Sequence, residues 1–108
     1  MGREVAAALQ RWPALIDHPV WPQLTAVCDI NEAALGWFDQ IATVTTKVTD
    51  YRQLLDDPSI DVIYVAVRHD LHESIYREVI AAGKGLLAEK PFGIDEGAAK
   101  SILAAVEE

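Results

Sequence analysis

The feature that most constrains the fold of this 108-residue chain is a regular alternation of amphipathic segments with short apolar ones. Apolar residues at helical spacing predict helices, and short runs rich in β-branched residues predict strands. The expected helices cover about 2–15, 32–41, 50–55, 70–82 and 96–106, and the expected strands cover 24–28, 43–48, 61–67 and 85–88. Such alternation favours an α/β fold, a parallel sheet covered by helices, and the length suits a single domain over residues 1–108.

Polar residues and glycines at the segment ends support this division. Asn31 and Asp95 are expected to cap the helices that follow them, and Asp70 with Glu73 has the pattern of a capping box. Gly83 is placed to end a helix in a left-handed conformation. Leu103 and Val106 are expected to face the core, with the large aromatic side chains Trp12, Trp21, Trp37 and Phe38.

Composition excludes several classes of protein. The chain carries 9 Lys and Arg against 17 Asp and Glu, with a net charge of −8 and no basic cluster, so we expect no nucleic-acid partner. No apolar stretch approaches the ~18 residues of a membrane span, and no signal peptide precedes the first helix, so the expected compartment is the cytoplasm. Cys28 is the single cysteine and is expected to be an inert core thiol. The three histidines lack metal-pair spacing, so we expect no metal site.

In a parallel sheet of this kind, ligands bind beyond the carboxyl ends of the strands. Asp29 ends the strand over 24–28, where a carboxylate can accept hydrogen bonds from the ribose hydroxyls of a dinucleotide. A carboxylate there also repels a 2′-phosphate, which favours NAD over NADP. The alternative is a surface Asp beside the helix cap Asn31.

The segment Arg68–His72 follows the strand over 61–67, so its backbone would pass the middle of a bound dinucleotide. His72, in the first helical turn, is the stronger site candidate and His69 the weaker one. Arg68 could contact a phosphate or be solvated. The alternative for the whole segment is a polar loop with Asp70 as a helix cap.

Glu89-Lys90-Pro91 follows a strand that is expected to be buried. Burial would lower the pKa of Lys90, and the neighbouring Glu89 would raise it again. Such a lysine can donate a hydrogen bond or a proton to a substrate oxygen during hydride transfer. Pro91 is a candidate for a cis peptide bond. The alternative is an exposed lysine in a turn.

Together, residues 24–31 (LTAVCDIN), 50–67 (DYRQLLDDPSIDVIYVAV), 69–72 (HDLH) and 83–92 (GKGLLAEKPF) resemble the Gfo/Idh/MocA oxidoreductase family. The resemblance implies a Rossmann-like three-layer domain that binds NAD(P) and belongs to a dehydrogenase for sugar-like or polyol hydroxyls. It implies that Asp29 binds the adenosine ribose and that the cofactor is lined by Val67, Arg68, His69 and His72. Glu89 and Lys90 would lie by the nicotinamide, with Lys90 contacting a small polyhydroxylated substrate.

The chain departs from the family pattern in several places. The first strand and the first glycines of G-x-G-x-x-G are absent, and Gly2 matches the third glycine. The long interval from Gly2 to Asp29 makes 17–22 look like an insertion. Arg68-His69 replaces the usual Pro-Asn. The resemblance implies a second domain that carries the family's catalytic Asp and His, and we expect residues 1–108 to lack it.

A sheet that is incomplete at its first strand would leave apolar edges, and each unpaired buried backbone group costs about 1–3 kcal/mol. Open edges also favour association, so a homo-oligomer is one expectation. Without the glycine turn, the 108-residue chain is expected to bind NAD weakly or not at all.

Two other classes of function remain open at this point. One is a non-catalytic module that binds a nucleotide or a protein partner. The other is a methyltransferase-like fold that uses Asp29 for the ribose of S-adenosylmethionine. The methyltransferase ranks last because it gives Glu89-Lys90-Pro91 no role.

Overall fold

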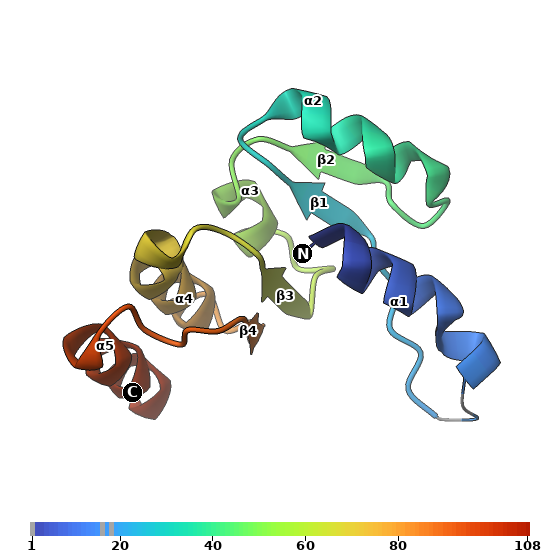
Figure 1. Cartoon of the computed structure of the whole chain (residues 1–108). Helices are drawn as coiled ribbons and strands as arrows, with labels where there is room; N and C mark the ends of the chain where they lie inside the picture. Colours follow the sequence, from blue (N-terminus) through green and yellow to red (C-terminus); the bar gives the residue numbers. More distant parts are fainter. Residues whose placement is uncertain (1, 16, 18) are drawn as a thin grey trace. The chain divides into compact units, whose positions relative to one another are not determined.

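The computed structural model describes residues 2–15, 17 and 19–108. The chain divides into two compact units, Met1–Leu54 and Leu55–Glu108, and each is described by itself (Figure 1). Within the described residues, no helix combines the length and apolar character that crossing a membrane requires.

The first unit contains a pair of parallel strands and the helices next to them in the chain. Its elements are α1 (Gly2–Leu15), β1 (Ala26–Cys28), α2 (Glu32–Leu35), the 3-10 helix η1 (Gly36–Gln40) and β2 (Thr46–Val48). Strands β1 and β2 pair in register from Ala26 with Thr46 to Cys28 with Val48. Both strands are shorter than expected. The buried side chains of this unit are Ala6, Val27, Leu35, Ile41 and Leu54.

The helix expected over 32–41 changes type partway along. Asn31 caps it as predicted, since its side-chain oxygen accepts a hydrogen bond from the Ala33 amide at 3.1 Å. The α-helix ends at Leu35, and the 3-10 helix begins at Gly36. Glycine has a low helix propensity, and tightening into a 3-10 turn is common near helix ends.

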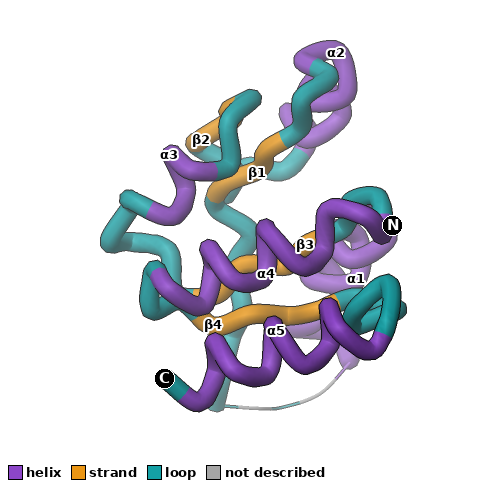
Figure 2. Tube along the Cα trace, turned by 90° about the vertical axis from the view of Figure 1, so that its left-hand side faces the viewer, coloured by secondary structure: helices purple, strands orange, loops and turns teal. Residues whose placement is uncertain are grey.

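The second unit is built around a β–α–β arrangement. Its elements are β3 (Val62–Val65), the 3-10 helix η2 (His69–Leu71), α4 (His72–Ala81), β4 (Gly85–Ala88) and α5 (Glu96–Glu107), and the short α3 (Arg52–Leu55) precedes them. Strands β3 and β4 pair in parallel, from Val62 with Gly85 to Val65 with Ala88. Helix α4 packs on both strands, and α5 packs on α4 (Figure 2). The buried apolar side chains are Val65, Ile75, Tyr76, Val79, Ala98 and Ile102.

In the part of the chain that the structure describes, four strands form two separate two-stranded parallel sheets. The parallel α/β class is confirmed, but burial of the strands is not as expected. Val62 and Leu87 are 53% and 56% exposed, although their strands were predicted to be buried. Each strand has one neighbour in its sheet, so much of its apolar surface remains in water. Leu103 and Val106 on α5 are exposed as well, which corrects their predicted inward position.

The signals at the helix ends were predicted correctly except at Asp70. Gly83 has a φ of 76° just after α4, and Asp95 caps α5 by accepting from the Ala98 amide at 2.8 Å. Asp70 caps no helix, because its carboxylate accepts hydrogen bonds from the Arg68 guanidinium at 3.2 and 3.0 Å. The cap residue of α4 is Leu71, which makes no side-chain capping bond.

Gly93 is needed for the close approach of its loop to α5. A β-carbon at Gly93 would lie 2.5 Å from the Ala99 nitrogen and 2.9 Å from the Ala99 Cα. Gly93→Ala should therefore lower the free energy of unfolding by about 1–3 kcal/mol, measured by urea denaturation.

The matched control for this prediction is Gly97→Ala in α5. A β-carbon at Gly97 meets only the Asp95 carboxylate, at 3.4 Å. Alanine also favours a helix over glycine by about 1 kcal/mol, so this variant should be neutral or more stable. Equal losses in the two variants would show that the tight contact at Gly93 is not the cause.

Candidate functional site

The candidate site lies where β4 ends and the chain enters Glu89-Lys90-Pro91. Beyond Ala88, the main chain of Glu89 is held by a side chain of α4. The buried Tyr76 hydroxyl donates to the Glu89 carbonyl at 2.9 Å and accepts from the Glu89 amide at 2.9 Å. One phenol therefore satisfies both backbone groups of the residue before Lys90.

His72 holds the other side of the same turn. Its ring is 1% exposed and stacks on Tyr76, with centroids 4.8 Å apart. Nδ1 lies 2.7 Å from the Pro91 carbonyl, and Nε2 lies 3.3 Å from the Val67 carbonyl. His72 thus links the segment after β3 to the segment after β4. Its burial leaves little of the ring accessible to a ligand, and its expected contact with a cofactor stays a prediction.

The Glu89 carboxylate has two donors of its own. The Tyr64 hydroxyl donates to Oε2 at 2.7 Å, and the Lys90 amide donates to Oε1 at 3.3 Å. The Tyr64 hydrogen bond, followed by that of the Lys90 amide, lowers the pKa of the Glu89 carboxyl. Burial raises the pKa of the Tyr76 phenol, and the Glu89 carboxylate adds to that rise.

We expect Tyr64→Phe to raise the pKa of Glu89 toward the ordinary value of about 4.3, because it removes the main donor. In the native chain this group stabilises the fold above its ordinary pKa, and the stabilisation is lost as pH falls through the lower folded value. The measurement is an NMR titration of the Glu89 carboxyl carbon.

Tyr51→Phe, in the other unit, is the control for that titration and should leave Glu89 unchanged. A Glu89 pKa that does not move in Tyr64→Phe would contradict the assigned hydrogen bond.

Lys90 lies on the surface of this unit. The Lys90–Pro91 peptide bond is cis, as predicted. Lys90 is exposed, and most of β4 is exposed too, so the expected burial of this strand is wrong. The structure therefore supports accessibility of Lys90 to a ligand rather than its desolvation.

Segment 67–70 forms an exposed path between β3 and α4. Val67 is 38% exposed, and the side chains of Arg68 and His69 are exposed. The pairing of Arg68 with Asp70 partly neutralises its charge, so a phosphate would compete with that carboxylate. His69 lies edge-on to His72, with ring centroids 5.4 Å apart.

In the first unit, Asp29 follows β1 as predicted. Its amide donates to the Val48 carbonyl at 3.2 Å, and its carboxylate accepts from the Asn31 amide at 2.8 Å. Asp29 is exposed, so its carboxylate can still accept from a ligand. Next to it, Cys28 is half-buried, and burial, followed by the charges of Asp29 and Asp50, raises the pKa of its thiol.

Gly2 begins α1, and Met1 lies outside the described residues. The expected insertion over 17–22 has no regular structure at residues 17 and 19–22, and residue 18 lies outside the described ones. Trp21 is 60% exposed, so it is not the core residue that was expected. The Trp12 indole donates a hydrogen bond to the Val20 carbonyl at 2.9 Å.

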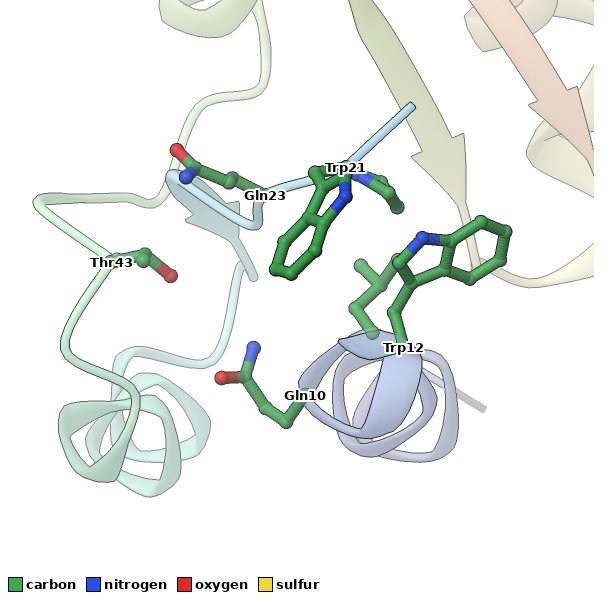
Figure 3. A pocket seen from close by; sticks show the side chains of 7 residues that line it. Gln10, Trp12, Trp21, Gln23 and Thr43 are labelled. Atoms are coloured by element: carbon green, nitrogen blue, oxygen red, sulfur yellow. The ribbon is translucent and has the colours of Figure 1, made fainter. Parts of the chain in front are cut away.

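Trp12 and Trp21 line a shallow hollow of about 140 Å³ (Figure 3). Gln10, Gln23 and Thr43 are among its other lining residues, and none of the seven is titratable. The hollow therefore offers no acid or base for catalysis and is not part of the candidate site.

Tyr64 and Tyr76 are the site residues that the sequence analysis missed. Tyr76 lies one helical turn after His72, so the two side chains share one face of α4. That spacing was the available signal, but it does not distinguish a hydrogen-bonding tyrosine from an ordinary core aromatic.

Comparison with known proteins establishes the class of the chain. Residues 2–108 match the model of the Gfo/Idh/MocA group, described as "Oxidoreductase family, NAD-binding Rossmann fold". The chain belongs to this family.

Two solved structures and one curated relative illustrate the similarity. Trans-1,2-dihydrobenzene-1,2-diol dehydrogenase of Xenopus laevis is 31% identical over 97% of this chain and 30% of its own length. A levoglucosan dehydrogenase in complex with NADH is 25% identical, with a TM-score of 0.89 over 100% of this chain and 29% of that one. A 3-ketoreductase from Actinomadura kijaniata, in complex with NADP, is 28% identical, with a TM-score of 0.72 over 88% and 29%. The chain thus spans less than a third of the length of these relatives.

Proposed function

We propose that this chain is the NAD(P)-binding part of an oxidoreductase that acts on CH–OH groups of sugar-like or polyol substrates. The observation that carries the proposal is the Glu89-Lys90-Pro91 turn, held by hydrogen bonds at the carboxyl end of a parallel strand in a chain of this family. The relatives that act on a diol and on levoglucosan support the substrate class.

The residues of each unit fit the parts of a dinucleotide that the proposal gives them. Asp29 has an exposed carboxylate that can accept hydrogen bonds from ribose hydroxyls. Val67, Arg68 and His69 form an exposed path at the end of β3 and are suited to line the cofactor. Gly2, at the start of α1, would allow phosphates to approach the helix N-terminus.

A nicotinamide cofactor held by these residues would supply the hydride chemistry. Lys90 donates a hydrogen bond to the substrate oxygen, and it takes or returns the hydroxyl proton according to the direction of the reaction. Glu89 holds its carboxylate beside the turn through Tyr64, so a negative charge stays next to the lysine.

We further propose NAD as the preferred cofactor. The Asp29 carboxylate would repel a 2′-phosphate, and the cation Arg68, in the second unit, is already paired with Asp70. One similar structure holds NADH and another NADP, and we assign the choice between them in this chain to Asp29.

The test is an assay of the whole protein that carries this sequence, with NAD and a panel of polyols, cyclic diols and anhydrosugars. Reduction of NAD with at least one of these substrates is the expected result. Binding of NADH without any turnover would contradict the dehydrogenase and favour the non-catalytic nucleotide-binding module. An increase in thermal stability with S-adenosylmethionine, and none with NAD, would favour a methyltransferase.

A further inference from the structure

Two buried side chains on one face of α4 clamp the main chain on both sides of Lys90. Tyr76 holds both backbone groups of Glu89, and His72 contacts the Pro91 carbonyl at 2.7 Å. Both rings are almost completely excluded from water, whereas Lys90 is exposed. The fixed part of the turn is therefore its backbone, and the accessible part is the lysine side chain.

The protons in this cluster can be assigned from the distances. A carbonyl only accepts, so the 2.7 Å contact with Pro91 requires a proton on Nδ1 of His72. The Tyr76 hydroxyl, 3.2 Å from the same nitrogen, uses its single proton on the Glu89 carbonyl. Nε2 faces a second carbonyl, Val67, at the longer distance of 3.3 Å. The main tie between His72 and the turn is therefore Nδ1 to Pro91.

We infer that His72 and Tyr76 are positioning residues that fix the direction in which Lys90 leaves the strand end. This inference rests on the proposed role of Lys90. Neither residue touches a substrate; each acts through the backbone of Glu89 or Pro91. Since a misplaced proton donor slows chemistry without weakening cofactor binding, the two residues contribute to kcat.

The experiment exploits two isosteric substitutions of His72. The amide nitrogen of Asn matches the place of Nδ1, and that of Gln matches the place of Nε2. His72→Asn keeps a donor for Pro91, whereas His72→Gln leaves Pro91 without one and places the donor toward Val67. Tyr76→Phe retains the ring and removes only the hydroxyl.

The first readout is amide hydrogen exchange, which does not depend on activity. In Tyr76→Phe, the Glu89 amide should exchange about tenfold faster, the effect of losing one hydrogen bond. In His72→Gln, the Lys90 and Phe92 amides should exchange faster than in His72→Asn. The Val79 and Ile102 amides, in buried parts of α4 and α5, report whether each variant is folded.

The second readout is steady-state kinetics of the whole protein with NAD. Tyr76→Phe and His72→Gln should lower kcat about tenfold with the dissociation constant of NADH unchanged, and His72→Asn should restore most of the rate. Equal behaviour of the Asn and Gln variants in both readouts would overturn the inference. So would unchanged kcat in all three variants of an enzyme that still requires Lys90. Full activity without Lys90 would instead overturn the proposed function and leave the exchange result standing.

Discussion

Lys90→Met in the whole protein that carries this sequence should lower kcat for alcohol oxidation by about 10²- to 10⁴-fold, the contribution of a positioned acid–base group that takes the hydroxyl proton. Methionine keeps the length and flexibility of the side chain and removes its charge and its protons. The dissociation constant of NADH should change little, because Lys90 is proposed to contact the substrate oxygen. Stability should also change little, since Lys90 is exposed.

Lys100→Met is the matched control for this variant. Lys100 is an exposed lysine on α5 that pairs with Glu96 one helical turn away. Surface pairs of this kind contribute little, so its removal should leave kcat, cofactor binding and stability nearly unchanged. A Lys90→Met enzyme with full activity would remove Lys90 from the mechanism.

In the whole protein that carries this sequence, Asp29→Asn should weaken binding of NAD by about 10- to 100-fold, the cost of losing hydrogen bonds to a charged acceptor. The substitution isolates the charge, because an asparagine oxygen can still accept from the Asn31 amide as Asp29 does at 2.8 Å. Affinity for NADP should fall less or rise, since the repulsion of a 2′-phosphate disappears. Calorimetric titration with each cofactor measures both changes.

Asp50→Asn is the control at the neighbouring strand end. Asp50 follows β2 and accepts from the Arg52 amide at 3.0 Å, so it copies the local geometry of Asp29. It should affect neither cofactor. A preference for NAD over NADP that survives Asp29→Asn would show that Asp29 does not discriminate between them.

Much of the fold could be predicted because its local signals agree with one another. Residue type and spacing predicted the extents of α1 and β4. They also predicted the caps Asn31 and Asp95 and the left-handed conformation of Gly83. The helix over 32–41 was predicted too regular, because spacing alone could not show that Gly36 begins a 3-10 turn.

Burial was the weaker part of the prediction. The sequence pattern of an apolar strand such as β3 is the same whether the strand has one neighbour in the sheet or two. The pattern therefore could not predict that Val62 is exposed. Asp70 has the sequence pattern of a cap, but Arg68 two residues earlier offers a charged partner for its carboxylate.

The position of the candidate site was predicted, and its construction was not. The strand-end rule located Asp29, the segment after β3 and the turn at Lys90. It could not show that His72 is buried, since that depends on contacts with Pro91 and Val67 that lie on different segments. The roles of Tyr64 and Tyr76 depend on the same kind of contact with Glu89.

The most direct test of the central claim is an NMR titration of the whole protein with NADH, following the amides at Asp29 and at Glu89 and Lys90. We expect both groups to shift and to give a single dissociation constant, because the proposed function assigns the ribose and the nicotinamide of one dinucleotide to Asp29 and to the Glu89-Lys90 turn. Shifts confined to one group, or absent from both at saturating NADH, would contradict it.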